Sequence, residues 1–206
     1  VCKMMRERLM ARPIPVQIPI GAEDGFRGVV DLVGMRALVW DDDTLGQPYR
    51  VESIPPELQS VAEAGRDTIV EAATEVDDRL LEMYLAGDAI SEDDLVAALR
   101  AGTVAGKFVP VLCGTAFRNK GVRPLLEAVL RYLPSPLDVP PVEGADPDSG
   151  DPVERAADDD APFAALVFKI MTDPFVGHLA FVRVYSGVLE AGSQVYVPRR
   201  RQVSRV

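Results

Sequence analysis

A continuous apolar run followed at once by an amphipathic helix is the feature that most constrains the fold. Residues 108–113 read Phe-Val-Pro-Val-Leu-Cys, which is typical of a strand buried on both faces of a parallel sheet. Apolar residues then recur at helical spacing, namely Val122, Leu125, Leu126, Val129, Leu130 and Leu133. A buried strand that leads into such a helix is half of a βαβ unit, so residues 107–137 predict part of an α/β core.

Short strands are predicted near the start of the chain. Val16, Ile18 and Ile20 alternate with Gln17 and Pro19, which is typical of an edge strand. Apolar runs within residues 29–40 predict a hairpin around Gly34. A polar turn at 41–46 and another short strand at 49–52 are predicted after it. This part of the chain therefore predicts a short edge strand, a hairpin and one further short strand.

Helices are predicted on either side of these strands. Residues 4–10 look like the end of a helix, which prolines 13 and 15 stop. One long helical stretch is predicted from Pro55 to Gly87, which can adopt the left-handed conformation of a C-terminal cap. Ser91 and Asp94 form a capping-box pattern, which predicts the start of another helix.

The character of the chain changes between residues 138 and 161, which are rich in Pro, Asp and Gly and predict a linker. Three β-rich runs follow, broken by glycine turns, at residues 163–171, 179–185 and 194–197. Closely spaced strands of this kind favour the first part of a small barrel. The predicted fold class is therefore α/β plus β.

Charge excludes several classes of function. The net charge is −10, and residues 22–106 hold nineteen acids against six basic residues, which argues against nonspecific nucleic-acid binding and against DNA as a partner. The end of the chain reverses this sign, through Arg199, Arg200, Arg201 and Arg205. No apolar run reaches the roughly 18 residues of a membrane span, and residues 1–12 lack the apolar core of a signal peptide.

No catalytic or metal-binding residue is predicted. Cys2 and Cys113 are far apart and have no Cys/His pattern beside them, so we interpret both as reduced thiols. His178, the only histidine, follows a glycine at the start of a predicted strand. We interpret it as an exposed turn residue.

Three short segments mimic nucleotide-binding motifs without completing them, at Gly106-Lys107, Asn119-Lys120 and Asp31 to Gly34. A P-loop would need glycine at position 101, where Ala101 stands, and a helix after Lys107. The guanine-reading N-K-x-D motif would need an acid in place of Val122. The D-x-x-G pattern at Asp31 lies inside a predicted hairpin, away from any phosphate loop.

The loop after the predicted strand at 108–113 is the one candidate binding site. Gly114, Thr115, Ala116 and Phe117 resemble the last base-contacting loop of Ras-like GTPases, where serine is usual in place of Thr115. In that family, backbone N–H groups of the loop approach the guanine oxygen. Small residues suit this role because the main chain must come close to a flat ligand.

A longer resemblance supports this interpretation. Several stretches closely resemble, in the right order, the bacterial elongation factor G family of translational GTPases: residues 15–23 with 28–33 and 37–40, then 109–122, 132–140, and 169–177 with 183–187. The resemblance runs in register from about Leu9 to Val206. It implies the C-terminal part of a Ras-like P-loop GTPase domain with an α+β insert subdomain, followed by the first strands of a translation-factor β-barrel.

The resemblance also implies boundaries and a role. It makes residues 1–13 the end of a GTPase-core helix, residues 14–106 the insert, and residues 107–137 the last core strand and helix. Residues 138–161 are then a linker, and residues 162–206 an incomplete barrel (domain II). The intact family uses GTP and Mg²⁺ to drive translocation of tRNA and mRNA on the ribosome. It is cytoplasmic, and it contacts stalk proteins through the insert and small-subunit rRNA through the barrel.

The P-loop, the switch regions, D-x-x-G and N-K-x-D of that family would all lie before Val1, which is not a methionine. We therefore expect an internal fragment that by itself neither binds nor hydrolyses GTP and holds no cofactor. Three alternatives stay open: a tetracycline-type ribosomal protection protein or paralogous translational GTPase, a nucleotide-free module that binds the ribosomal stalk, and an unrelated GTPase.

Overall fold

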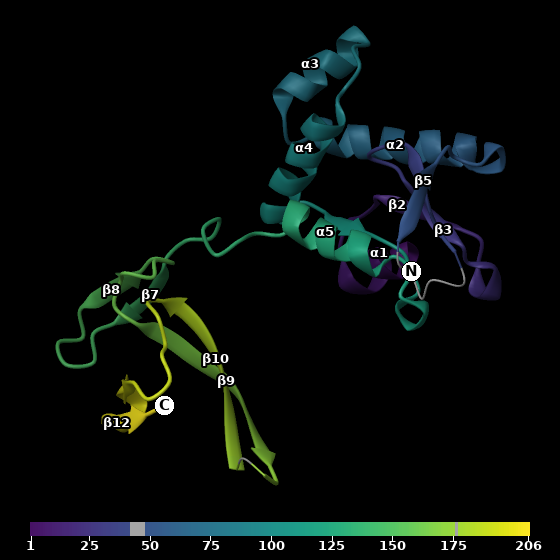
Figure 1. Cartoon of the computed structure of the whole chain (residues 1–206). Coiled ribbons are helices and arrows are strands. Elements are labelled where there is room, and N and C mark those ends of the chain that lie inside the picture. Colours follow the sequence, from purple (N-terminus) through teal and green to yellow (C-terminus); the bar gives the residue numbers. More distant parts are fainter. Residues whose placement is uncertain (42–47, 176) are drawn as a thin grey trace. The chain divides into compact units, whose positions relative to one another are not determined.

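The computed structural model describes residues 1–41, 48–175 and 177–206 (Figure 1). The chain divides into two compact units, Val1–Leu133 and Pro134–Val206. Most of the polar turn predicted at 41–46 lies outside the described residues, as does Val176.

An antiparallel sheet of four strands organises the first unit. Its order is β2 (Gln17–Ile20), β3 (Gly28–Asp31), β4 (Arg36–Trp40) and β5 (Tyr49–Glu52). The edge strand, the hairpin and the last short strand are confirmed. In the hairpin, Asp31 pairs with Arg36 across the turn.

Four helices of the first unit are α1 (Cys2–Leu9), α2 (Gln59–Thr74), α3 (Asp78–Ala86) and α4 (Glu92–Val104). The prediction of one long helix up to Gly87 is wrong, because α2 ends at Thr74 and a separate helix begins at Asp78. The Asp77 side chain accepts hydrogen bonds from the backbone of Arg79 and Leu80 and so starts a new helix. The caps at Gly87 (φ 77°) and at Ser91, whose hydroxyl accepts from the Asp94 N–H, are confirmed.

The core of the first unit lies between the sheet and the helices. Fully buried side chains come from β3 and the turn after it and from α2, α3 and α4, namely Val30, Leu32, Ile69, Leu80, Leu95 and Leu99. A smaller apolar cluster of Phe26, Val29, Leu38 and Trp40 also contacts Cys113, which leads into the candidate loop. This second cluster connects the sheet to that loop.

A parallel pair of strands, β1 (Pro13–Pro15) and β6 (Val109–Val111), completes the first unit. The parallel strand was predicted, but its burial on both faces was not correct, because Val109 is 43% exposed. The prolines expected only to stop a helix themselves form β1. Its pairing places β6, and the loop after it, against the start of the chain.

Helix α5 (Val122–Tyr132) forms where it was predicted, yet its orientation differs. Its buried residues are Pro124, Ala128 and Tyr132. The apolar stripe expected to face the core is instead largely exposed, with Leu126 at 61% and Leu130 at 81%. Proline, alanine and tyrosine side chains of α5, rather than its leucines, therefore pack against the rest of the unit.

The second unit consists of three antiparallel hairpins: β7 (Val142–Ala145) with β8 (Pro152–Arg155), β9 (Ala164–Asp173) with β10 (Gly177–Ser186), and β11 (Gln194–Val197) with β12 (Gln202–Arg205). The first hairpin falls within residues 138–161, so the stretch predicted as a linker contains two short strands. The β-rich runs after it are confirmed as strands. Within the ranges described, no helix is both long and apolar enough to cross a membrane.

Candidate functional site

The candidate loop between β6 and α5 closes on itself. The Thr115 N–H donates to the Lys120 carbonyl at 2.9 Å, and the Lys120 N–H donates back to the Thr115 carbonyl at 3.1 Å. A single 3-10 turn, η4 (Ala116–Arg118), fills the space between them. These hydrogen bonds therefore define the backbone conformation of the loop.

Two glycines allow this closure. A side chain at Gly114 would place its Cβ 2.7 Å from the Lys120 carbonyl oxygen. Gly121 has φ +87°, and a Cβ there would lie 3.0 Å from the Cys113 carbonyl oxygen. Both positions require glycine because the two arms of the loop touch through their backbones.

The structure brings together only part of the predicted site. Gly114 and Ala116 line a shallow depression of about 160 Å³ that Cys113, Val122 and Leu125 also border. Thr115 does not line it and already uses its N–H within the loop. Phe117 is fully exposed. The first N–H groups of η4 have no partner within the turn, so Ala116 and Phe117 supply the donors that a ligand could meet.

Two basic residues that sequence reasoning did not select fix the loop to a distant turn, which contains η1 (Glu23–Gly25). The Arg118 guanidinium donates to the Asp24 carboxylate at 2.8 Å and to its carbonyl at 3.3 Å. Lys120 is only 2% exposed, and its ammonium donates to the Phe26 carbonyl oxygen at 3.5 Å. No sequence signal marks these contacts, because 94 residues separate the partners.

Cys113 precedes the loop but is not activated for nucleophilic chemistry. Burial raises the pKa of its thiol to about 11. Its backbone N–H faces the Gln17 side-chain oxygen at 3.4 Å, a contact that links the end of β6 to β2. The residue therefore serves packing at the base of the loop.

Comparison with known proteins gives two findings. A sequence model described as elongation factor G domain 2 matches residues 162–206. The crystal structure of ttk003000868 from Thermus thermophilus matches 94% of this chain with a TM-score of 0.70 and 29% sequence identity. Residues 162–206 are therefore similar to domain 2 of elongation factor G, and nearly the whole chain shares the fold of the Thermus protein. This chain spans about a quarter of the Thermus chain, 26% of its length.

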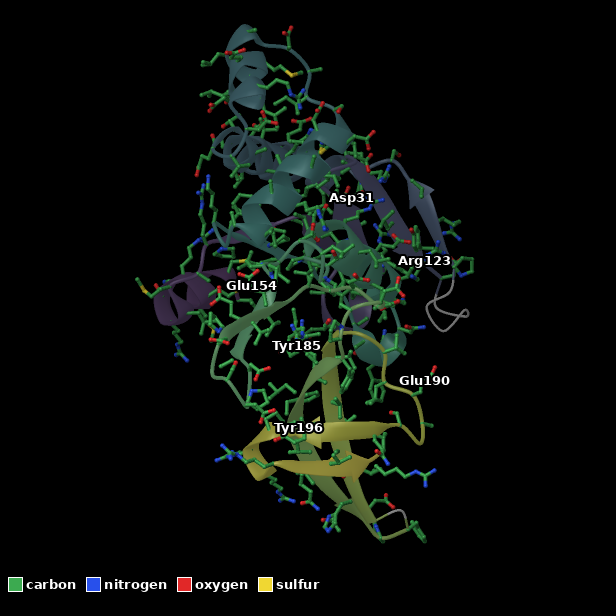
Figure 2. The ribbon with its side chains drawn as sticks, turned by 90° about the vertical axis from the view of Figure 1, so that its left-hand side faces the viewer. Asp31, Arg123, Glu154, Tyr185, Glu190 and Tyr196 are labelled. Carbon is green, nitrogen blue, oxygen red and sulfur yellow. The ribbon has the colours of Figure 1, made fainter. Side chains whose placement is uncertain are left out.

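Two of the incomplete nucleotide-binding motifs have structural roles. Asp31, labelled in Figure 2, accepts hydrogen bonds from the N–H groups of Val33 and Gly34 and pairs with Arg36 at 3.2 Å, so its D-x-x-G pattern builds a hairpin turn. The Lys107 ammonium donates to the Glu75 carbonyl at 3.2 Å. Neither residue faces a phosphate-binding loop in the described ranges.

Metal-ligating side chains form no metal centre in the described part of the chain. No group of three or more His, Cys, Asp or Glu side chains is arranged to hold a metal ion there. His178 lies exposed at the start of β10, where its Nδ1 is 3.5 Å from the Thr172 hydroxyl.

Proposed function

We propose that this chain works as part of an elongation factor G-type translational GTPase that drives GTP-dependent translocation of tRNA and mRNA on the ribosome. In this proposal residues 1–13 and 107–137 belong to a Ras-like GTPase core, residues 14–106 form its insert subdomain, and residues 162–206 belong to domain II. The proposal rests on the domain 2 match at residues 162–206, together with a structural likeness that extends over both units.

The loop at Gly114 to Phe117 would supply backbone contacts to the guanine base. Its two available N–H groups could each contribute about 1 kcal/mol. Even a millimolar complex requires about −4 kcal/mol after the loss of translational and rotational freedom. We therefore propose that GTP and Mg²⁺ bind only in the context of the family's phosphate-binding segments, and that these 206 residues alone neither retain nor hydrolyse GTP.

Calorimetry of the purified chain with GTP and Mg²⁺ tests this proposal. We expect no saturable heat up to about 1 mM nucleotide, because two hydrogen bonds cannot give even millimolar affinity. GDP and ATP serve as matched ligands that separate base recognition from phosphate binding. Submicromolar binding of GTP or GDP, but not ATP, would show that the chain carries a complete guanine-nucleotide site.

The ribosome is the proposed partner, and the cytoplasm the proposed location. Helices α2 to α4 expose many carboxylates, among them Glu63, Glu71, Glu82 and Asp93, which suit a contact with stalk proteins. The basic turn between β11 and β12, Arg199 to Arg201, is exposed and suits a contact with small-subunit rRNA phosphates.

Cosedimentation with intact and stalk-depleted ribosomes tests both contacts. Loss of the stalk should release a chain held by the insert, whereas R199Q/R200Q/R201Q should weaken the rRNA contact and its salt dependence. Binding to isolated stalk protein in the absence of ribosomes would favour the second candidate function, a nucleotide-free stalk-binding module. Failure to sediment with either ribosome would contradict the proposed partner.

A further inference from the structure

A cleft of about 200 Å³ lies between the antiparallel sheet and helix α5. The sheet lines it with the face that carries Gln17, Asp31 and Arg36, which lie opposite one another on β2, β3 and β4. The helix lines it with the face that contains its buried residues Ala128 and Tyr132. We call this space the sheet–helix cleft. All of its walls belong to the first unit.

The Gln17 side chain offers an unused donor in this cleft. Gln17 is 9% exposed, and its side-chain oxygen accepts from the Cys113 backbone N–H at 3.4 Å, which fixes the orientation of the amide. Among the described side-chain polar atoms, only the Ser186 hydroxyl is both unbonded and sealed from solvent. The Gln17 nitrogen has no printed partner and is therefore open, and because Gln17 lines the cleft, a ligand there can accept from it.

The charges around the cleft compensate one another. Its lining holds two acids and two bases, namely Asp31, Glu127, Arg36 and Arg131. Asp31 pairs with Arg36 at 3.2 Å. Glu92 lies 2.8 Å from Arg36 and 3.9 Å from Arg131, and Glu127 pairs with an arginine one turn earlier on α5 at 3.0 Å. A charged ligand would have to compete with these pairs, whereas an uncharged one leaves them intact.

Tyr132 further disfavours an anion. It is 5% exposed, and burial, reinforced by the carboxylates of Asp31 and Glu92, raises the pKa of its phenol to about 12. The phenol therefore keeps its proton at neutral pH and is a hydrogen-bond donor. The same burial and the same carboxylates would oppose a negative charge on a ligand atom beside it. The acceptor that suits this wall is uncharged.

The rest of the lining is mainly apolar and limits the size of the ligand. It includes side chains of the sheet and of the strand before the candidate loop, namely Val16, Leu38, Val51 and Leu112, and the ring of Tyr49. An apolar cavity of about 150 Å³ holds benzene. A cleft of about 200 Å³ therefore suits one ring or branched chain that carries a single small polar group.

We propose that the sheet–helix cleft binds a small uncharged carboxamide with a compact apolar body. The carboxamide oxygen accepts from the Gln17 side-chain nitrogen, with the Tyr132 hydroxyl as the second donor. The carboxamide N–H donates to the Glu127 oxygen that its neighbouring arginine leaves unused. The apolar body lies against Leu38 and Val51. The cleft includes no residue of the guanine-base loop, so this site goes beyond the proposed function.

Amide NMR titration of the 206-residue chain with benzamide tests the site, read at the side-chain NH2 signals of Gln17 and the backbone amide of Ala128. We expect saturable shifts with a Kd in the millimolar range. Benzoate and benzylamine have the same ring with a charge of either sign, and each should bind at least about fivefold more weakly. Toluene, which lacks the carboxamide, should also bind at least about fivefold more weakly.

Variants assign the contacts. Q17L should weaken benzamide about fivefold, as expected for one neutral hydrogen bond. Because Q17L also removes the bond to Cys113, Y132F is the second variant; it keeps the ring and should weaken benzamide to a similar extent. Q59L and Y84F, at exposed positions outside the cleft, are matched controls and should change affinity less than about twofold.

Three outcomes would overturn the proposal. Absent saturation with benzamide would mean that the cleft holds only water. Equal affinity for toluene would mean a purely apolar site. Unchanged affinity in both Q17L and Y132F would place the bound benzamide elsewhere on the chain.

Discussion

At the scale of single residues, Arg118 connects the candidate loop to a turn formed by the start of the chain. Its guanidinium bonds both the carboxylate and the carbonyl of Asp24, although the Asp24 side chain is 99% exposed. An exposed ion pair contributes about 0–1 kcal/mol to the free energy of unfolding. Its main effect should therefore be on the order of the loop, not on global stability.

We expect R118Q to speed hydrogen exchange at the Thr115 and Lys120 amides about fivefold, an effect of about 1 kcal/mol on local opening. The midpoint of thermal unfolding should move by only a few degrees. R123Q is the matched control, since Arg123 pairs with Glu127 at 3.0 Å on α5 and not with Asp24. R118K should restore slow exchange. Equal exchange in R118Q and the parent chain would show that Lys120 alone holds the loop.

Cys113 makes a pH-dependent prediction. Because burial raises the thiol pKa to about 11, the thiolate should amount to about 0.1% at pH 8. Alkylation by iodoacetamide should therefore be slow in the folded chain and rise about tenfold per pH unit until pH 11. Mass spectrometry of the Cys113 peptide measures this rate, with urea-unfolded chain as the reference.

The raised pKa of the Cys113 thiol also makes the free energy of unfolding depend on pH. The folded thiol holds its proton more tightly than the unfolded one, whose ordinary pKa is 9.0. The contribution of the protonated Cys113 thiol to the free energy of unfolding is therefore fully present below pH 9 and is lost as the pH rises towards 11. Alkylation of the folded chain as fast as of the unfolded chain at pH 8 would show that the thiol is not buried.

At the scale of elements, α5 exposes the leucines and buries the small residues. Ala128 is 6% exposed and Leu130 is 81% exposed on the same helix. We expect A128E to lower the free energy of unfolding by about 2 kcal/mol or more, because the carboxylate would be desolvated. L130E should change it by less than about 0.5 kcal/mol and should reduce self-association of the exposed stripe.

Urea unfolding and light scattering measure the two effects. A chain in which L130E is the damaging variant would have the leucine stripe in its core, as helical periodicity predicts. The comparison therefore decides which face of α5 packs against the unit. It also shows whether the exposed stripe is responsible for aggregation.

These elements show what sequence can predict. Periodicity located α5 and the strands, and local chemistry located the caps at Gly87 and Ser91, because these signals act within a few residues. The break at Asp77 was missed since apolar spacing continues through it. The buried face of α5 and the partners of Arg118 and Lys120 depend on contacts between distant segments, which no local pattern records.

The same limit applies to the candidate site. Its position and its glycines followed from the strand-loop-helix pattern, and the structure brings Gly114 and Ala116 to one depression. The use of the Thr115 N–H within the loop could not be predicted. It depends on a six-residue closure that only the left-handed Asn119 and Gly121 allow.

At the scale of the whole molecule, the two units differ in how much they bury. The first has a large buried core, whereas β9 of the second exposes Phe168 at 63% and Ile170 at 67%. Two-stranded hairpins without a covered face are marginally stable in water. The units should therefore unfold separately, the second before the first.

Trp40, the only tryptophan, reports on the first unit, where it is 3% exposed and packs 5.4 Å from the Tyr49 ring. In a urea titration we expect part of the β-strand circular dichroism to be lost at least about 1 M below the midpoint of Trp40 fluorescence. A chain that ends at Leu133 should keep the fluorescence midpoint and lose the early transition. Coincident transitions in the full chain would mean that the two units stabilise each other, and that the exposed strands of the second are covered in solution.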